Sequence, residues 1–228
     1  MQQDIRTISL ALPYRLGSVN CYLIETETGH ILIDSGCSNK RAHLEKELES
    51  AGCKPGNLQL IVLTHGDFDH TGNAAYLREK FGASIAMHHD DSGMTERGDM
   101  FWNRKRGNVL LRKAASILFR FGKLARFEAD LKVEDGYDLS GYGLDARVLS
   151  IPGHSKGSIS ILTASGDLFC GDLLVNGDKP RLNSIIDDPA AARASVERLR
   201  GLGINTVYPG HGNPFPMALF LSEVTKPA

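Results

Sequence analysis

The sequence predicts a layered α/β domain, with β-sheet inside and helices outside. Two patterns carry this prediction: short apolar strand-like runs alternate with amphipathic helical runs, and tight hairpin turns interrupt the alternation. The 228 residues, 42% of them hydrophobic and 23% charged, are enough to bury one large core or two modest ones. This composition excludes a disordered or fibrous chain. Because no internal repeat or low-complexity linker interrupts the sequence, we expect one domain over residues 1–228.

The expected elements follow in a definite order. Two strands, 19–25 and 30–34, should pair across the turn 26–29, and a helix should run from a capping Ser38 to a stop at Gly52. The later helical patterns cover 73–81, closed by Gly82, and 188–202. The other strand-like runs are 59–63, 84–87, 147–151, 158–163, 167–170 and 205–208.

The segment from about residue 88 to 135 breaks this rhythm. From Arg104 to Arg126 it carries eight basic residues and no acidic one, interleaved with apolar side chains. This pattern predicts a basic, amphipathic helical insertion. Its apolar face should cover the functional cleft, its own domain, a partner subunit in a homodimer, or a membrane surface.

Bulk properties narrow the partners and the compartment. A formal net charge of −1 gives no general attraction to nucleic acid or anionic membranes. The first residues lack a signal-peptide pattern, and no apolar run reaches the roughly 20 residues that span a bilayer. Cys21, Cys37, Cys53 and Cys170 show no CxxC spacing, which favours reduced thiols over a disulfide framework. We therefore expect a cytoplasmic protein with no nucleic-acid partner and no transmembrane segment.

The stretch IVLTHGDFDHTGN, residues 61–73, places two histidines and two aspartates within six positions directly behind a strand. Imidazole and carboxylate groups are the usual ligands of zinc and similar divalent ions, and catalytic sites leave one coordination position for water. Further motifs follow strand-like runs downstream: PGHS at 152–155, CGD at 170–172 and YPGHG at 208–212. The sequence therefore indicates a metal site assembled at strand ends.

These motifs, together with HILIDSG at 30–36, resemble those of the metallo-β-lactamase superfamily of metal-dependent hydrolases, from about Asp4 to Pro216. The resemblance implies a single metallo-β-lactamase-like domain, a four-layer αββα sandwich with a dinuclear metal cleft at one edge of its sheets. It implies that His65 and His154 bind the first metal. It also implies that Asp172 bridges both metals, and that the second metal is held by Asp69, His70 and His211.

Asp67 departs from the family pattern His-x-His-x-Asp-His, in which a second histidine stands at this position. A carboxylate is anionic and harder than imidazole, so it shifts preference from zinc toward manganese or iron, or weakens the first site. We expect Asp67 to be a direct ligand. In one alternative it instead hydrogen-bonds to a ligand and orients it, and in the other the first site is half-empty. The expected cofactors are two divalent metal ions, Zn²⁺ first, with Mn²⁺ or Fe²⁺ as alternatives. On this reasoning Asp67→His should raise zinc affinity.

The expected chemistry is hydrolysis by a metal-activated hydroxide. Two divalent ions lower the pKa of a bound water from about 15.7 to about 7. Asp69 is the expected catalytic residue, which orients that water and takes a proton, and Asp34 should hold a ligand by hydrogen bonding. We expect His88 and His89 to lie outside the site and Lys156 to lie on the surface.

Because the chain ends soon after His211, we expect none of the extra domains that some superfamily members carry. A small carboxylic ester, thioester or lactone is then the expected substrate class. The basic insertion would favour an anionic small molecule, and it also supports an alternative, a phosphodiesterase or phospholipase-like hydrolase. A non-catalytic metal-binding module, in which Asp67 disables the first site, is a third alternative.

Overall fold

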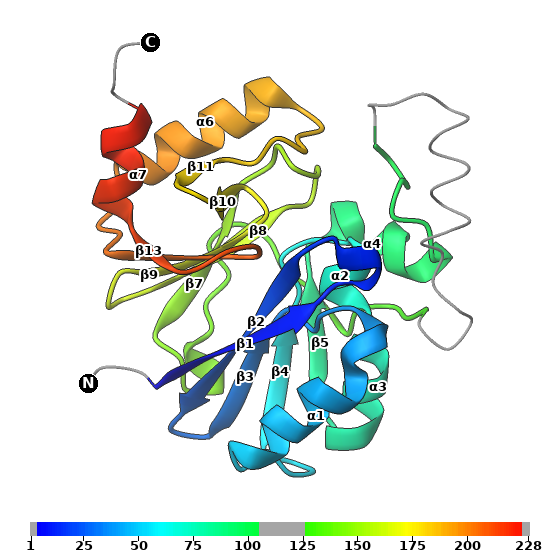
Figure 1. Ribbon diagram of the computed structural model, residues 1–228. Coiled ribbons are helices and arrows are strands. Elements are labelled where there is room, and N and C mark those ends of the chain that lie inside the picture. The colour runs from blue at the N-terminus through cyan, green and yellow to red at the C-terminus, as the bar shows by residue number, and fades with distance from the viewer. Residues whose placement is uncertain (1–3, 105–125, 225–228) are drawn as a thin grey trace.

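Two β-sheets packed face to face form the centre of the computed structural model, which describes residues 4–104 and 126–224 (Figure 1). The first sheet has the strand order β1-β2-β3-β4-β5-β6, with parallel pairing from β3 to β6. Its strands are β1 Ile5–Ala11, β2 Ser18–Thr26, β3 Gly29–Ile33, β4 Leu58–Val62, β5 Ser84–Met87 and β6 Leu131–Lys132.

The second sheet has the order β13-β12-β9-β8-β7, in which only the β12–β9 pair is parallel. Its strands are β7 Ala146–Ser150, β8 Ile159–Thr163, β9 Asp167–Gly171, β12 Thr206–Pro209 and β13 Phe215–Pro216. A separate hairpin follows β9 and consists of β10 Leu174–Asn176 and β11 Pro180–Leu182.

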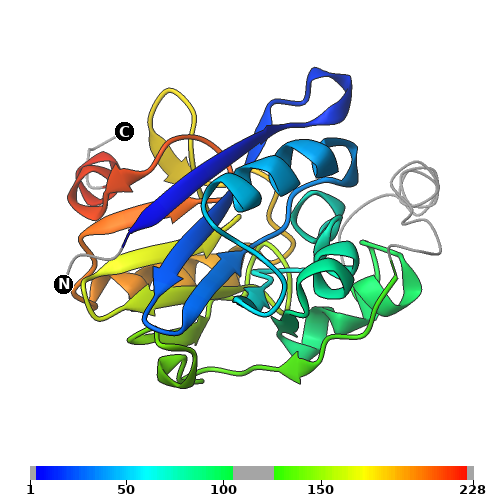
Figure 2. The same ribbon diagram turned by 90° about the horizontal axis from the view of Figure 1, so that it is seen from below.

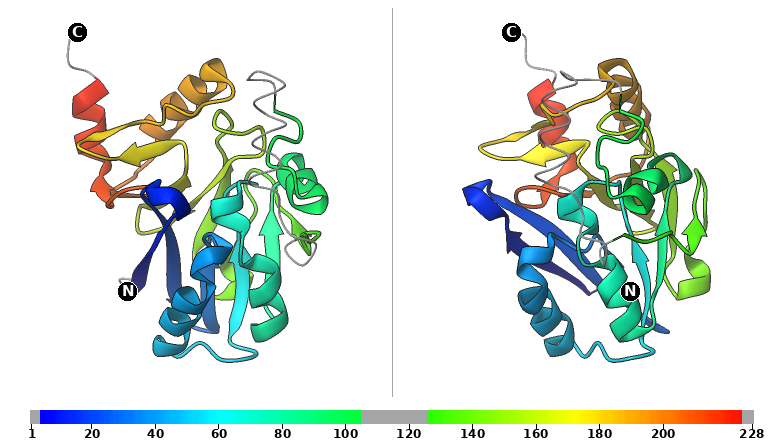
Figure 3. Two further views of the ribbon diagram at one scale, coloured as in Figure 1. Left: turned by 45° about the vertical axis from the view of Figure 1, so that its right-hand side comes forward. Right: turned by 90° about the vertical axis from the view of Figure 1, so that its right-hand side faces the viewer.

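Helices cover the outer face of each sheet, and three apolar clusters join the layers. Helices α1 Arg41–Ser50 and α3 Ala74–Phe81 share one buried cluster with the first sheet. Helices α6 Pro189–Arg200 and α7 Met217–Val224 share another with the second sheet. The third cluster lies between the sheets and includes Tyr22, Val62, Val148 and Phe169. Figure 3 shows the two helix pairs on opposite sides of the sheets, and Figure 2 shows α1 in front of the strands of the first sheet. The expected four-layer αββα sandwich is confirmed.

Most elements expected from the sequence occur within two residues of their expected ends. Asp188 begins α6 because its carboxylate accepts hydrogen bonds from the backbone amides of Ala190 and Ala191. Ser38, by contrast, does not cap α1: a 3₁₀ turn, Ser38–Lys40, precedes the helix, and no side chain caps it. The sequence reading also lacked β1, whose alternating burial along one edge of the sheet gives only a weak signal.

The range 88–135, expected as an insertion, contributes to the domain at both ends. Helix α4, His89–Arg97, follows β5, and β6 extends the first sheet. Phe127 and Ala129 are buried in the cluster beneath α3. The basic stretch that defined the insertion lies mostly in 105–125, outside the described residues. Among the helices of the described ranges, none has the length and apolar character needed to cross a bilayer.

Candidate metal centre

The ends of five strands bring the candidate ligands together at one edge of the two sheets. Asp34 follows β3, and residues 64–70 follow β4. His154 follows β7, Asp172 follows β9, and His211 follows β12. The carboxyl ends of parallel strands meet at the same edge of a sheet, which is where ligand sites form in open α/β folds. The structure thus gathers residues spread over almost 180 positions of the chain.

Four histidines face one another through the same ring nitrogen, Nε2. In three of them Nδ1 donates outward to an oxygen: His70 to Asp34 Oδ2 at 2.8 Å, His154 to the Ile185 carbonyl at 2.6 Å, and His211 to the Ser18 carbonyl at 2.6 Å. His65 Nδ1 lies 2.9 Å from Thr64 Oγ1, which itself donates to Asp34 and can therefore accept from the ring. This pattern fixes the tautomer that leaves an Nε2 lone pair for a metal ion.

Two groups of candidate ligand atoms in this cluster are close enough to hold an ion each: His65, His154, Asp172 and Asp69, His70, His211. Within each group the ligand atoms all lie within 4.8 Å of one another. Among the described residues a third group, His88, His89 and Asp90, meets the same criterion at the start of α4. Three buried atoms of the first two groups make no hydrogen bond within the described ranges: His65 Nε2, His70 Nε2 and Asp172 Oδ1. A buried polar atom without a partner is costly, so these atoms fit a divalent ion that supplies the missing contact.

Asp172 lies between the two groups. Its Oδ1 is 3.4 Å from His70 Nε2, whereas its Oδ2 is 3.3 Å from His211 Nε2 and 4.0 Å from His154 Nε2. Asn183 Nδ2 donates to Oδ2 at 3.4 Å. Burial alone would raise the pKa of Asp172, but the imidazoles of His211 and His70 hold it well below its usual range. Its carboxylate faces both groups, which is the position that the resemblance assigned to a bridging residue.

The remaining electrostatics follow from burial and from these carboxylates. Burial, together with the charges of His70 and His154, lowers the pKa of His65 well below its usual value. Burial also acts to lower the pKa of His211, but Asp172 raises it to about 9. Among the candidate ligands Asp67, Asp69 and Asp172, Asp69 has the most solvent-accessible carboxylate, and burial raises its pKa. Its Oδ2 lies 3.5 Å from His211 Nε2.

Asp67 is the N-cap residue of the short helix α2, Phe68–Thr71, which carries Asp69 and His70. Its Oδ2 lies 3.1 Å from His154 Nε2 and 3.7 Å from His65 Nε2. Its Oδ1 accepts a hydrogen bond from Arg104 Nη2 at 2.5 Å. Burial alone would raise the pKa of Asp67, but the guanidinium of Arg104 and the imidazole of His154 hold it below its usual range.

Asp34 connects the two histidines of the HGDFDH motif. Besides the contact with His70, its carboxylate accepts from the Thr64 amide at 2.8 Å and from the Thr64 hydroxyl. The backbone of Asp34 has a φ of 58°, in the left-handed region, which turns the chain so that the side chain faces back toward β4. The sequence placed Asp34 beside a ligand, and in the structure its partners are His70 and Thr64.

Asp91 is a buried residue of this site that the sequence reading did not assign. From α4 its carboxylate accepts from Gly66 N at 3.1 Å, Gly157 N at 2.8 Å and Ser155 Oγ at 2.6 Å. It therefore joins the loop of His65 to the loop of His154. The sequence signal was only the HHDD run after a strand, which does not reveal which of its four residues points inward.

The flanking polar residues lie outside the cluster. His88 Nδ1 accepts from the Asp90 amide and begins α4, and His89 has a half-exposed side chain stacked on His88. Lys156 is exposed and forms an ion pair with Asp90 at 2.7 Å. These positions agree with the expectation that His88, His89 and Lys156 do not contact the metal site.

Gly210 provides the first test of the cluster's packing. A Cβ atom there would lie 2.3 Å from Asp172 Oδ1 and 2.7 Å from His70 Cε1, so Gly210→Ala should displace both ligands. A displacement of about 1 Å costs on the order of 100-fold in rate, and we expect a loss of that size in hydrolysis together with weaker metal binding. Metal content and kcat/KM check this. Gly177→Ala is the matched control, because no atom lies within 4 Å of its Cβ; equal behaviour of the two variants would contradict the packing argument.

Comparisons with known proteins agree on one family. A family model described as "Metallo-beta-lactamase superfamily" matches residues 14–211. The chain is 30% identical to "Probable metallo-hydrolase MJ0888" of Methanocaldococcus jannaschii, over 86% of this chain and 88% of that protein. It is also 30% identical to "Acyl-coenzyme A thioesterase MBLAC2" of Bos taurus, over 87% and 71%. Among solved structures, a di-iron-bound form of TTHA1623 matches with a TM-score of 0.72 and 28% identity, over 94% of this chain and 96% of that one.

Proposed function

The chain belongs to the metallo-beta-lactamase superfamily, and we propose that it is a dinuclear metal-dependent hydrolase of a small carboxylic ester, thioester or lactone. The observation that carries the proposal is the convergence of four Nε2 atoms on the carboxylates of Asp69 and Asp172, with three buried donor atoms left without a hydrogen bond. Buried lone pairs and carboxylate charges without partners are energetically costly, and two bound cations would remove this cost.

The residues divide between two metal positions in this proposal. His65, His154 and Asp67 would serve the first position, and Asp69, His70 and His211 the second, with Asp172 between them. Two bound ions would supply Lewis acidity and a nucleophile at neutral pH. Zinc is the first choice for histidine-rich sites. Iron or manganese are the alternatives, since Asp67 adds an oxygen ligand and one similar structure holds two iron ions.

The protein's own side chains would position the reactants. Asp69 lies at the accessible side of the cluster, so it can orient an attacking water and accept its proton. Burial raises its pKa, which makes the carboxylate a better base than an exposed aspartate. Asp34 would hold His70 in place from the far side of the ring.

The thioester option has a further support. One relative that is 30% identical is named an acyl-coenzyme A thioesterase. A thioester and a carboxylic ester share a trigonal carbonyl carbon, and hydroxide attack at that carbon releases a carboxylic acid together with a thiol or an alcohol, so one site can accommodate both. A cytoplasmic location agrees with four cysteines that are free and buried.

The test combines metal removal with a substrate panel. Protein purified without chelators should contain two metal equivalents and hydrolyse at least one of a set of aryl esters, acyl thioesters and lactones. Dialysis against a strong chelator should reduce that activity at least about 100-fold, and added Zn²⁺, Mn²⁺ or Fe²⁺ should restore it, because the ions supply several kcal/mol of transition-state stabilisation.

Three outcomes would contradict the proposal. Activity that survives complete metal removal would exclude the metal-dependent mechanism. One metal equivalent with no turnover on any substrate would indicate a metal-binding module. Turnover of bis-aryl phosphodiesters well above that of carboxylic esters would indicate the phosphodiesterase or phospholipase-like alternative.

A further inference from the structure

Arg104 forms a buried ion pair with Asp67, and the proposed function gives Arg104 no role. Both side chains are nearly inaccessible, with exposed fractions of 8% and 9%. Because of this ion pair, the two carboxylate oxygens of Asp67 have different partners. Oδ1 is held by Arg104, and Oδ2 is left toward the Nε2 atoms of His154 and His65. Asp67 therefore has one oxygen in a fixed contact and one facing the first metal position.

The backbone on both sides of the pair is also fixed. The carbonyl of Asp67 accepts from the amides of His70 and Thr71 and from the Thr71 hydroxyl, so the start of α2 cannot rotate freely. With the backbone held in this way, the orientation of the Asp67 carboxylate depends on what its side chain contacts.

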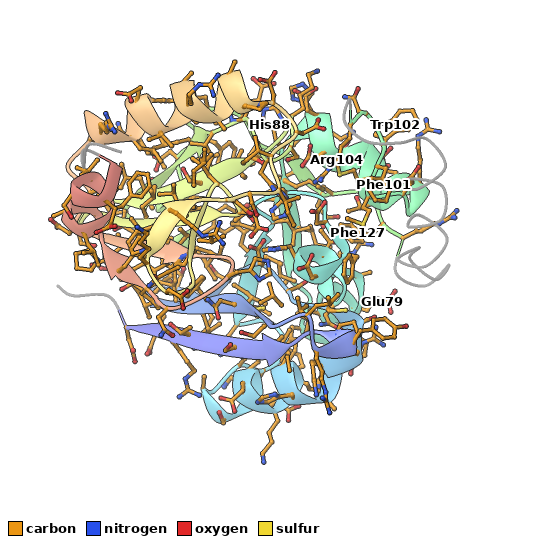
Figure 4. All side chains as sticks on the ribbon, turned by 45° about the horizontal axis from the view of Figure 1, so that its top comes forward. Glu79, His88, Phe101, Trp102, Arg104 and Phe127 are labelled. Atoms are coloured by element: carbon orange, nitrogen blue, oxygen red, sulfur yellow. The ribbon has the colours of Figure 1, made fainter. Side chains whose placement is uncertain are left out.

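Arg104 lies at the end of a turn, residues 99–104, that packs against α4. Within this turn Phe101 N donates to Asp99 Oδ1, Trp102 N to the Asp99 carbonyl, and Arg104 N to the Phe101 carbonyl. Trp102 sits so close to α4 that a Cβ on Gly93 would lie 2.2 Å from its Nε1. Arg104, Phe101 and Trp102 lie together on the α4 side of the molecule (Figure 4).

Helix α4 also contacts the loops that carry His65 and His154. Its residue Asp91, two positions before Gly93, accepts hydrogen bonds from Gly66 N in the first loop and from Ser155 Oγ in the second. Helix α4 and the turn after it therefore form one support. This support places a guanidinium beside Asp67 at a defined distance from the cluster.

Charge gives a reason for the arrangement. Asp67 adds a third carboxylate to a buried cluster that already holds Asp69 and Asp172. A buried carboxylate needs a hydrogen-bonded partner of opposite charge, and a guanidinium offers directional donors that an ammonium does not. Arg104 cancels the extra charge and occupies the oxygen that faces away from the first metal position.

We propose that Arg104 is a positioning residue of the first metal position, which holds Asp67 so that Oδ2 alone is presented to the metal. The proposal rests on the proposed dinuclear site. Arg104 and Asp67 then form a unit that replaces the single histidine usual at this position. Asp67→His by itself should therefore weaken the first metal position, contrary to the expectation from the sequence, because it leaves an uncompensated guanidinium beside an imidazole and a cation.

Metal titration of chelator-treated protein tests this inference. Zn²⁺ is added against a chromophoric competitor, and the number and affinity of the bound equivalents are measured for the wild type, Arg104→Met and Arg104→Lys. We expect Arg104→Met to lower the affinity of one equivalent by about 10- to 100-fold and to leave the other unchanged, as is found when a group orienting a metal ligand is lost. Arg104→Lys keeps the charge and should lose less.

A second pair of variants examines the unit itself. Asp67→His with Arg104→Met should bind the first equivalent more tightly than Asp67→His alone. The matched control is Arg198→Met, which removes another arginine–aspartate pair, with Asp135 at 2.7 Å, on the exposed surface. This control should keep both equivalents at wild-type affinity.

Several results would overturn the inference. Arg104→Met could bind both equivalents as the wild type does, or lose both equally. It could also keep its metals while raising KM for anionic esters alone, which would make Arg104 a substrate-binding residue. If Arg104→Met does not fold by circular dichroism, Arg104→Lys decides by the same criterion. A wild type that binds two ions but hydrolyses nothing would refute the proposed function and leave the role of Arg104 intact.

Discussion

Replacing Asp172 with alanine, or His70 with alanine, is expected to abolish hydrolysis while the fold remains. Asp172 faces both groups of donor atoms, and His70 contacts Asp172 and Asp34 at the centre of the cluster. Loss of either removes a proposed metal ligand that no neighbouring side chain replaces among the described residues. Since about 1.4 kcal/mol corresponds to tenfold in rate and a metal ion supplies several kcal/mol, kcat/KM should fall at least about 1000-fold.

The fold should survive because these side chains follow strand ends and do not contribute to the three apolar clusters. Circular dichroism and thermal unfolding of the metal-free proteins measure this. Asp167→Ala is a matched control, since Asp167 begins the strand whose far end precedes Asp172, and its carboxylate accepts from Ser165 Oγ in the exposed turn before that strand. Wild-type kcat/KM in either ligand variant would refute the dinuclear mechanism.

Replacing Asp91 with alanine is expected to lower the free energy of unfolding by about 2 kcal/mol or more. The substitution leaves the buried amides of Gly66 and Gly157 without their acceptor, and each such group costs about 1–3 kcal/mol. The Ser155 hydroxyl also loses Asp91 but keeps Ser158 Oγ at 2.7 Å. The loops of His65 and His154 would separate, so metal affinity should fall with stability. Urea unfolding of the metal-free protein gives the first quantity, and metal titration the second.

Asp91→Asn refines this prediction. Asparagine fills the same volume but offers one acceptor oxygen in place of two, so it should lose about half of the effect of alanine. Asp90→Ala is the control, because Asp90 is the adjacent residue and pairs with the exposed Lys156. An Asp91→Ala variant as stable as Asp90→Ala would show that the two loops hold their positions without the carboxylate.

Much of the fold could be predicted because its elements carry local signals. The run QLIVL reads as a buried strand from its apolar side chains, and β4 is found there at Leu58–Val62. Asp188 followed by Pro189 marks the start of α6. Elements without such a signal were not predicted. Strand β1 alternates polar and apolar residues at a sheet edge, and helix α4 contains the poor helix formers Asp, Ser and Gly.

The candidate ligands could be named before the structure because their chemistry is local to short motifs. Histidine and aspartate concentrated behind a strand end have few roles other than metal binding. Their partners could not be named, because His211 donates to the carbonyl of Ser18 and His154 to the carbonyl of Ile185, and every residue has a backbone carbonyl. Any residue can supply such a carbonyl, so no residue type signals it.

The sequence by itself determined the superfamily, the strands and helices with a strong local pattern, and the candidate ligand residues, because each depends on the identity of neighbouring side chains. Tertiary structure alone decided how Asp67 is used. Arg104 is 37 positions away and belonged, by composition, to a basic run that the sequence assigned to an insertion. Helix α4 packs on the loops of His65 and His154 through Asp91, and this packing brings Arg104 next to Asp67. The physical reason is that ion pairing depends on distance in space, and distance in space between remote residues is set only when the core has packed.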